Sequence, residues 1–494
     1  MKRVLSVLLV LAMLTAVFTA CGGDTGSAQP GETTAAQTQG ENTETTAAET
    51  EEVLTDGLPE KDMDGFILTI LHYNQKQLSW VNHQLMAEAE NGDLVNDAVY
   101  KRNREVEERF GAKLNIVEVD APGTTMANAV LAGETTYDIV LQSGANIISN
   151  IQYLSDFGQL DYIDFEGQHW NPDASGMFLI GGKRLAAAGN FVLAYLTGTS
   201  CTMFNKDLKD SLGIEDNFYK MVLDGKWTVD EFYRLARLAI ADLNGDGAMT
   251  RDDRFGALGT TSMVYHGSLI TGAGFKYVTH NKDGYPEFTM PDNEKMMSFV
   301  LEMLDIRINE PYLFYTESTS SGASDTYVLF EKGQSLFLSQ FVKRIQDYRG
   351  MDIDFGILPN PKYDEAQENY YGRTAIGEAS TLPKTVDPAR YENIGILLEA
   401  LAFHSQHNLL EDYKEVLLKT KLARDDDSAA MLDYVFNGMV FDIGMVVSSS
   451  TMDTVVGGMF FNKTNTLAST MASMETQADA AIEKIIQTVE ESMK

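Results

Sequence analysis

A stretch near the middle of the chain carries the residue types and spacing of a calcium loop. It runs from Asp242 to Asp253 and reads DLNGDGAMTRDD. Oxygen-bearing side chains recur at the spacing of an EF-hand loop, and the glycine at its sixth position permits the sharp turn. The predicted ligands are Asp242, Asn244, Asp246, the carbonyl oxygen of Ala248, Thr250 and Asp253. We expect a structural calcium ion here. The alternative is a turn held by its own hydrogen bonds.

One position departs from the calcium pattern. Asp253 stands where an EF-hand loop has glutamate, so this carboxylate reaches less far. Calcium is abundant outside cells, so a weak site there would stay filled. We expect the ion to pin a helix before the loop to a strand after it, which would add its binding energy to folding stability.

Signatures of covalent catalysis are absent from the sequence. The seven histidines are scattered, and His404 and His407 share a helix face without a zinc-protease motif. There is no nucleophile elbow, phosphate loop or dinucleotide fingerprint. With 72 acidic residues, a pair of carboxylates as in glycosidases stays possible. We expect no enzyme, and this pair is the open alternative.

The N-terminus has the pattern of an export signal. A basic start at Lys2 and Arg3 precedes an uncharged apolar run from Val4 to Phe18, which is too short to span a membrane. The segment resembles a bacterial lipoprotein signal, although Phe18 stands where that pattern usually has leucine. This resemblance implies a signal peptide over residues 1–20 and lipidation of Cys21. Plain secretion with cleavage nearby is the alternative.

A flexible linker follows the signal. Residues 22–57 contain no lysine, arginine or aromatic residue and little that could be buried. Such a segment cannot offset the entropy lost on ordering, so we predict a solvated acidic linker over residues 21–60. The protein is then expected at the extracellular face of the cell membrane, held by its lipid. The long linker favours a Gram-positive surface over a periplasm.

Composition excludes some partners. The formal charge of −34 argues against nucleic acid and anionic lipid as partners. The 494 residues are too many for one hydrophobic core, so two lobes are expected. Cys21 and Cys201 are the only cysteines, and lipidation of Cys21 leaves no internal disulfide. Cys201 lies in an apolar segment and is interpreted as a small core residue.

The first part of the fold reads as alternating strands and helices, which is typical of an α/β protein with a parallel sheet. Asn96 is expected to cap the first helix and Gly111 to end it. The sheet's ligands would gather beyond the carboxyl ends of its strands. The predicted elements are strand 66–72, helix 96–110, strand 114–119, helix 126–132 and strand 137–141.

A second α/β unit follows. Thr228 and Glu231 form a capping box at the start of one of its helices. From Tyr391 onward the chain is expected to be mostly helical. The predicted elements are strand 199–206, helix 228–241, strand 255–259, helix 265–274, helix 296–308, strand 335–338 and strand 355–358.

Fragments spread in order along the chain resemble one protein family. They are RNREVEERF (102–110), YDIV (137–140), MFNKDL (203–208), GKWTVDEF (225–232), FEKGQ (330–334), FGILP (355–359) and STLPK (380–384). Behind a lipoprotein signal, this order is similar to that of the family 1 extracellular solute-binding proteins of ABC importers, which include maltose-binding protein.

This resemblance implies a two-lobed α/β fold of the type II periplasmic-binding-protein class. Strands would cross between the lobes, which would close on ligand like a hinge. Residues 61–197 and 375–422 would form lobe one, and residues 198–374 and 423–494 would form lobe two. The protein would be a monomer that delivers a carbohydrate to ABC permease subunits.

The resemblance also implies which residues meet the ligand. Sugars are held by aromatic faces and by planar polar groups that bind hydroxyls. For each candidate, packing or turn formation is an equal alternative. The candidates are Tyr73, Asn74, Trp80, Gln142, Ser143, Thr199, Ser200, Tyr265, His266, Gln340, Phe341 and Glu378.

Departures from the family concern the tryptophans that stack on sugars. Phe341 stands where one is expected. Trp80 is the best stacking candidate, Trp170 is a core or cleft-rim residue, and Trp227 before a helix cap is interpreted as structural. The calcium loop is an insertion relative to the family pattern and is not expected to touch ligand.

Three functional hypotheses remain. The leading one is a lipid-anchored protein that captures a sugar or oligosaccharide for an importer. The alternatives are a secreted carbohydrate-active enzyme and a binder of peptides or other polar nutrients.

Overall fold

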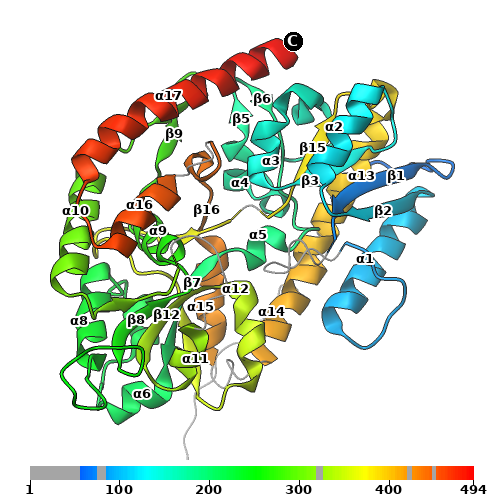
Figure 1. Cartoon of the computed structure of the whole chain (residues 1–494). Coiled ribbons are helices and arrows are strands. Elements are labelled where there is room, and N and C mark those ends of the chain that lie inside the picture. The colour runs from blue at the N-terminus through cyan, green and yellow to red at the C-terminus, as the bar shows by residue number, and fades with distance from the viewer. Residues whose placement is uncertain are drawn as a thin grey trace, which may run out of the picture. The chain divides into compact units, whose positions relative to one another are not determined.

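The computed structural model describes residues 56–74, 85–318, 326–375, 377–419, 426–447 and 452–493. The predicted signal peptide, Cys21, Trp80 and the linker as far as residue 55 lie outside the described residues. Residues 55–494 form one compact unit. Two five-stranded mixed sheets organise it, as Figure 1 shows, and each sheet is the centre of one lobe.

Lobe one is built on a sheet of strand order β2-β1-β3-β15-β4. Strand β1 pairs in parallel with β2 and β3, and β15 returns antiparallel to β3. The helices α1, α2 and α13 pack around this sheet. The bounds are β1 Ile67–Tyr73, β2 Lys113–Val119, β3 Ile139–Gln142, β4 Leu154–Ser155, β15 Ala379–Pro383, α1 Leu94–Phe110, α2 Pro122–Ala132 and α13 Tyr391–His404.

Helix α1 shows both a confirmed and a wrong sequence prediction. Gly111 ends the helix in the left-handed conformation, with φ of 57°, as predicted. The expected cap Asn96 is wrong. Asp93 is the cap, because its side chain accepts a hydrogen bond of 2.9 Å from the backbone N–H of Asn96. The helix therefore begins two residues earlier and buries Val95.

Lobe two is built on a sheet of strand order β11-β8-β12-β7-β13. Strand β12 runs parallel to β8 and antiparallel to β7. Thr228 caps α8 by accepting the backbone N–H of Glu231 at 3.4 Å, as predicted, whereas the Glu231 carboxylate accepts from Arg234 at 2.8 Å and does not complete the predicted capping box. The bounds are β7 Ser200–Asn205, β8 Phe255–Gly259, β11 Phe314–Tyr315, β12 Ser335–Phe341, β13 Phe355–Leu358, α8 Val229–Ala239, α9 Ser262–Gly272 and α10 Glu294–Asn309.

Aromatic residues fill the core of lobe two. Trp227 is fully buried and donates its indole N–H to the carbonyl of Pro359 at 2.9 Å, so its structural interpretation is confirmed. Its ring packs against Phe232 and Phe337. Cys201 is fully buried in β7, and burial raises the pKa of its thiol to about 12, which makes it an unreactive core residue.

The lobes are joined where distant segments meet. Thr199 and Thr374 form an isolated antiparallel bridge. A further connection follows α14, because α14 contacts α1 of lobe one whereas α15 contacts β13 of lobe two. Strand β16 then pairs with β14 beside the bridge. The bounds are α14 Leu410–Lys419, α15 Asp426–Asn437, β14 Gly372–Arg373 and β16 Met439–Val440.

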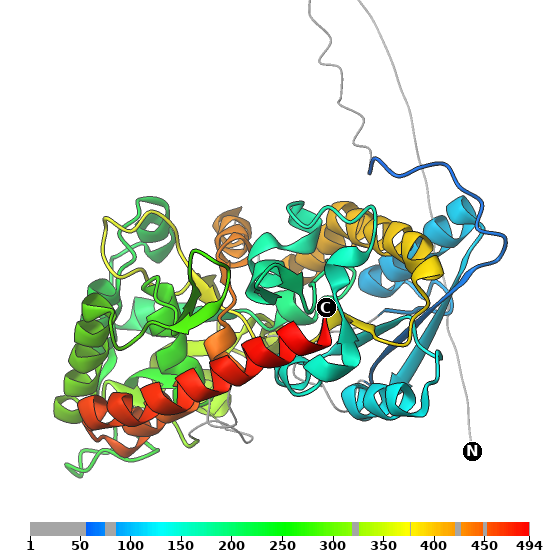
Figure 2. The same ribbon diagram turned by 90° about the horizontal axis from the view of Figure 1, so that it is seen from above.

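The last two helices differ in what they cover. Helix α16 (Met452–Asn462) packs on α9 of lobe two. Helix α17 (Leu467–Ser492) contacts both β10 (Pro286–Phe288) and η1 (Ile151–Tyr153), and Tyr285 directly before β10 donates to Glu490 near the C-terminal end of the helix. Since β10 belongs to lobe two and η1 to lobe one, α17 spans both lobes, as Figure 2 shows from above.

Shorter elements complete the chain. They are α3 Gly144–Ser149, α4 Pro172–Met177, α5 Ala194–Thr197, α6 Lys206–Ser211, α7 Phe218–Leu223, α11 Thr326–Glu331, α12 Val342–Asp347, β5 Leu179–Ile180, β6 Lys183–Arg184, β9 Val278–His280, η2 Phe157–Gln159, η3 Gln168–Trp170, η4 Tyr348–Gly350, η5 Pro388–Arg390, η6 Ser405–Leu409 and η7 Ile443–Met445. In the described part of the chain, no helix combines the length and apolar character that crossing a membrane needs.

Candidate functional site

A cavity of about 160 Å³ lies where the two lobes meet. Lobe one contributes the start of α3 and one residue of α4. The other wall comes from the crossing segment and from residues that follow β16. The lining residues are Ser143, Gly144, Ala145, Met177, Arg373, Thr374, Ala375, Asp442, Met445 and Val446.

Two larger hollows lie nearby in the chain of lining residues. One of about 350 Å³ shares Met177 with the cavity, and another of about 390 Å³ shares Pro172 and Asp173 with the first hollow. The smaller cavity is the better candidate because Ser143 directly follows the carboxyl end of β3. Ligands of α/β proteins gather at that edge of the sheet.

Predicted residues of lobe one do gather at this edge. Ser143 lines the cavity itself. The hydroxyl of Tyr73 and the side chain of Asn146 in α3 are hydrogen-bonded. The backbone N–H of Tyr73 donates to buried Glu378 at 3.1 Å, which ties the ends of β1 and β15 together. Asn74 hydrogen-bonds Asp120 beside them.

The side chain of Gln142 is hydrogen-bonded to neighbouring residues of lobe one and does not line the cavity. Its amide nitrogen donates to the hydroxyl of Thr381 at 2.8 Å, and its oxygen accepts from Asn150 at 2.8 Å. The side chain is fully buried. It therefore fixes β3 against β15 and sets the position of the neighbouring Ser143.

The crossing residues hold the lobes together. The hydroxyls of Thr199 and Thr374 lie 3.1 Å apart. The hydroxyl of Ser200 accepts a hydrogen bond of 2.9 Å from Asn360. Thr199 and Ser200 are fully buried, so they support the cavity through Thr374 and are not among its lining residues.

Two predicted residues of lobe two lie in its core. Tyr265 stacks on Phe314 with ring centroids 3.8 Å apart. His266 stacks on Phe460 at 3.6 Å, and burial lowers the pKa of its imidazole well below the usual value. Both are almost fully buried, because Phe460 of α16 covers His266, and Phe314 of β11 and Phe232 of α8 cover Tyr265. The structure does not bring them to the cavity.

Two other predicted residues are the last two residues of β12. The side chain of Gln340 is buried and donates to the hydroxyl of Tyr348 at 2.8 Å. Phe341 is half-buried, and the guanidinium of Arg373 lies 6.0 Å from its ring centroid. Phe341 therefore stands behind a lining residue of the cavity.

Sequence reasoning missed the charged wall of the cavity. Arg373 binds Asp453 through its Nε and Nη2 atoms, both 2.6 Å from one carboxylate oxygen. The two residues are 80 positions apart, and both side chains are buried. The available signal was an arginine placed directly before a predicted crossing between lobes, where burial of a charge requires a partner.

Asp442 is the second missed group. Its carboxylate accepts backbone N–H groups of Tyr277 at 2.5 Å, Gly444 at 2.8 Å and Val278 at 3.3 Å. Burial outweighs these hydrogen bonds and raises the pKa of Asp442 to about 6. The ionised carboxylate of Asp442 is therefore unfavourable, although its oxygen atoms accept hydrogen bonds from the backbone.

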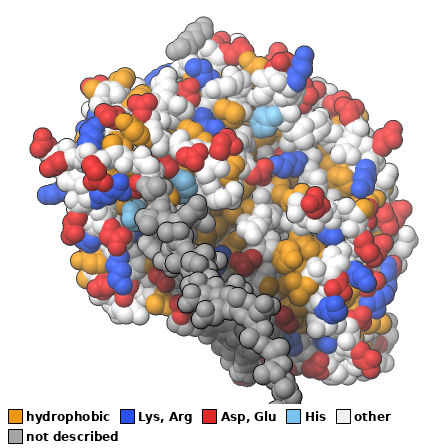
Figure 3. Space-filling model, turned by 180° about the vertical axis from the view of Figure 1, so that it is seen from behind, with side chains coloured by type: hydrophobic (Ala, Val, Ile, Leu, Met, Phe, Trp, Pro, Cys, Tyr) orange, Lys and Arg blue, Asp and Glu red, His pale blue; other side chains and the backbone are white. Residues whose placement is uncertain are grey.

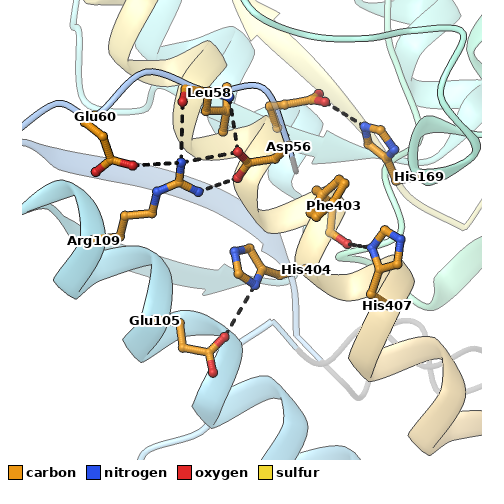
Figure 4. Close-up of polar contacts among 10 residues, drawn as sticks. Asp56, Leu58, Glu60, Glu105, Arg109, His169, Phe403, His404 and His407 are labelled. Carbon is orange, nitrogen blue, oxygen red and sulfur yellow. Dashed lines mark hydrogen bonds and ion pairs between the residues drawn. The ribbon is translucent and has the colours of Figure 1, made fainter. Parts of the chain in front are cut away.

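Residues outside the cavity have structural partners. Trp170 is fully buried and donates its indole N–H to Glu399 at 2.6 Å, which resolves its open interpretation in favour of the core. In Figure 4, His404 faces Glu105 at 3.4 Å, and Nδ1 of His407 lies 2.8 Å from the carbonyl of Phe403. Each of the two helix histidines therefore has a partner within the protein.

Figure 4 also shows where the described chain enters lobe one. The guanidinium of Arg109 in α1 binds the carboxylate of Asp56. The side chain of Leu58 packs against the lobe-one core. The predicted linker over residues 21–60 therefore includes residues that contact the folded lobe at its C-terminal end.

The predicted calcium loop folds as a closed turn between α8 and β8. Ala241 and Arg254 pair at its base, and Gly247 at loop position 6 has φ of 80°. The carboxylate of Asp242 accepts from the N–H groups of Gly245 and Gly247 at 2.6 and 2.7 Å.

Within the same loop, buried Asp253 accepts from the backbone N–H groups of Leu243 and Thr250. These hydrogen bonds, that from Thr250 above all, lower its pKa. Among the described residues, no three His, Cys, Asp or Glu side chains are grouped to hold a metal ion. The calcium ion therefore stays a prediction.

We expect Asp442 to make stability depend on pH. Its pKa is about 6 in the folded protein and about 4 in the unfolded chain, so the fold binds the proton more tightly. The free energy of unfolding should therefore rise as pH falls from about 6 to about 4, by roughly 3 kcal/mol in all. Asp442→Asn should lose this contribution, measured by urea unfolding at several pH values.

The control for this prediction is Asp283→Asn, which changes an exposed aspartate in a surface turn. The free energy of unfolding of this variant should depend on pH as that of the unmodified protein does. An Asp442→Asn variant whose stability follows pH as the unmodified protein does would refute the assignment.

Comparisons with known proteins identify the fold. No family model matches the sequence, and no curated protein matches it. Solved structures of substrate-binding proteins do match, at 13 to 14% identity. The ABC substrate-binding protein Lmo0181 from Listeria monocytogenes, in complex with cycloalternan, has a TM-score of 0.50 at 13% identity, covering 87% of this chain and 100% of its own.

Two further structures agree. UspC from M. tuberculosis has a TM-score of 0.53 at 13% identity, covering 84% of this chain and 100% of its own. A cyclo/maltodextrin-binding protein complexed with maltotetraose has a TM-score of 0.53 at 14% identity, covering 86% and 96%. The chain thus has the two-lobed α/β fold of ABC substrate-binding proteins, as its sequence predicted.

Proposed function

We propose that this protein captures a carbohydrate between its two lobes and delivers it to an ABC importer. The observation that carries this proposal is the cavity at the crossing between the lobes. Its walls come from both lobes, so a ligand there would favour the closed arrangement. The similar structures from Listeria and of the cyclo/maltodextrin-binding protein contain cycloalternan and maltotetraose, which supports a sugar as ligand.

The chemistry of the cavity supports binding over catalysis. Asp442 is the one carboxylate among the described lining residues, and it already accepts three backbone N–H groups. A glycosidase needs two carboxyl groups on either side of the scissile bond. A peptide site would offer free charges to the peptide termini, whereas Arg373 is already paired with Asp453.

Binding of a neutral sugar is the direct test. Residues 22–494 contain the whole compact unit and are used with maltotriose, cellotriose, mannotriose, xylotriose and a mixture of tripeptides. One trisaccharide should raise the unfolding temperature and give a calorimetric Kd, and long incubation should yield no smaller sugar. Ser143→Trp should weaken binding at least tenfold, because the indole fills the cavity.

The matched control is Ser149→Trp at the exposed end of α3, which should bind sugar normally. Binding of tripeptides alone would support the peptide alternative, and release of shorter sugars would support an enzyme.

We further propose that the protein is a lipoprotein anchored through Cys21 at the extracellular face of the membrane. The support is the export signal ending at a cysteine, followed by the acidic linker. In a bacterial host, the full chain should incorporate labelled palmitate and sediment with membranes. Cys21→Ser should lose both properties, whereas Cys201→Ser should keep them. Label retained by Cys21→Ser would exclude this anchor.

Calcium binding by the loop of Asp242 to Asp253 is the remaining part of the proposal. A calcium concentration 100 times Kd would stabilise the fold by about 2.7 kcal/mol. The chelator EGTA should therefore lower the unfolding temperature, and Asp246→Ala should abolish the difference. Asp252→Asn changes a residue outside the predicted ligands and should retain it. If neither calcium nor chelator changes the unfolding temperature, the loop does not bind calcium and is a turn held by its own hydrogen bonds.

A further inference from the structure

Two hairpins join the lobes at a second place, apart from the crossing segments. The hairpin of β5 and β6 belongs to lobe one, and the hairpin of β9 and β10 extends from lobe two between α9 and α10. The backbone N–H of Gly181, at the first turn, donates to the carbonyl of Gly284, at the second turn, at 3.0 Å. In Figure 1, β5 and β6 lie near the C-terminal end of α17, whereas α5 and β7 of the crossing lie nearer the centre.

Each hairpin is fixed to its own lobe at its base. In lobe one, the backbone N–H of Arg184 donates to Asp156 at 3.0 Å, and the guanidinium of Arg184 donates to the carbonyl of Ser175 at 2.6 Å. In lobe two, the ring of Phe275 before β9 packs against Phe299 of α10, with centroids 5.6 Å apart. The contact between the two turns is therefore a contact between the lobes.

Tyr285 strengthens the contact between the turns. Gly181 has φ of 56°, and a Cβ atom there would lie 2.6 Å from the ring of Tyr285, so the ring packs directly on the glycine. A glycine adopts this conformation readily and leaves room for the ring. The hydroxyl of Tyr285 donates to Glu490 of α17 at 3.1 Å, and α17 also contacts η1 of lobe one.

An ion pair ties the base of the β9–β10 hairpin to lobe one. Nζ of Lys276, just before β9, lies 3.0 Å from Oδ1 of Asp173 in α4. Oδ2 of Asp173 also accepts the backbone N–H of Phe441 at 3.1 Å. The side chains of Lys276 and Asp173 are partly exposed, so their attraction is weak by itself and adds to the contact at the turns.

These contacts limit how the lobes can turn. Two bodies joined at two separate places can rotate only about the line through both places, and any other rotation must break one of the contacts. The bridge of Thr199 and Thr374 is buried and lies in segments that run between the lobes. Gly181, Gly284 and Tyr285 are only half-buried. The contact between the hairpins is therefore the one that separates first.

We infer that the contacts at the two turns and the ion pair form an interlobe latch, which holds the lobes in the arrangement of this structure when no ligand is bound. None of its residues lines the cavity at the crossing. The latch therefore acts on the resting position of the lobes and not on the ligand. It consists of Gly181, Gly284, Tyr285, Glu490, Asp173 and Lys276.

The test measures the distance between the lobes in the absence of sugar. Spin labels are attached to residues 22–494 through Glu134→Cys in lobe one and Glu215→Cys in lobe two, which replace exposed residues, whereas Cys201 is buried. Pulsed electron paramagnetic resonance should give one narrow distance distribution. A broad distribution in this protein would overturn the inference. The measurement contains no sugar, so its result is independent of the proposed function.

Gly181→Ala should open the latch, because the added methyl group displaces the ring of Tyr285. The ratio of longer to shorter distances should rise about tenfold when the packing and the hydrogen bond of Tyr285 are lost. The matched control is Gly182→Ala in the same turn, where φ is 80° and no atom lies within 4 Å of an added Cβ. It imposes a similar backbone strain and should keep the narrow distribution. Equal distributions in the two variants would overturn the inference.

Lys276→Met tests the latch without changing a turn, and serves if Gly181→Ala does not fold. Loss of the ion pair with Asp173 should raise the same ratio about threefold. The control is Lys220→Met, which removes an ion pair with Asp224 inside lobe two and should leave the distances unchanged. Identical distributions in Lys276→Met and its control would also overturn the inference.

Discussion

The pairing of two distant segments at Thr199 and Thr374 is the constraint on which the rest of the structure depends. Both segments run between the two lobes. The hydroxyls of Thr199 and Thr374 lie 3.1 Å apart, and both side chains are buried. The bridge fixes where β14 and β16 pair, and through them where Arg373 and Asp442 stand. The cavity exists because the end of β3 faces these same crossing segments.

Buried charge is tolerated at this junction because each group has partners. Asp453 neutralises Arg373, and backbone N–H groups surround Asp442. Removing one partner of such a pair would leave an uncompensated buried charge, so each group depends on its partners for its place in the fold. Charged side chains on the outer surface are arranged differently from this buried pair. On the face in Figure 3, acidic side chains are scattered among basic ones rather than gathered into one patch.

Local sequence signals predicted the scaffold well. Gly111 ended a helix, Thr228 began one, and the apolar residues around Cys201 formed a buried strand, because each depends on neighbours in the chain. The overall fold followed from the order of such elements together with a family resemblance. The similar solved structures share only 13 to 14% identity, so packing is retained where individual residues are not.

The site was less predictable because it depends on contacts between distant segments. Ser143 was found because it follows a strand end, which is a local property. Tyr265 and His266 also follow a strand end, yet Phe314 of β11 covers the first and Phe460 of α16 covers the second, so both are buried. The pair of Arg373 and Asp453 spans 80 positions and has no periodicity that could reveal it. Strand ends therefore locate the site, whereas tertiary packing decides which side chains reach it.

Helix α17 has a mechanical consequence for the two lobes. A helix keeps a nearly constant length, because extending it would break backbone hydrogen bonds, so α17 acts as a rod laid across the junction. It contacts β10 of lobe two and η1 of lobe one, so a change in the separation of the lobes must shift or break at least one of these contacts. The two lobes are thereby coupled by an element that lies outside the cavity.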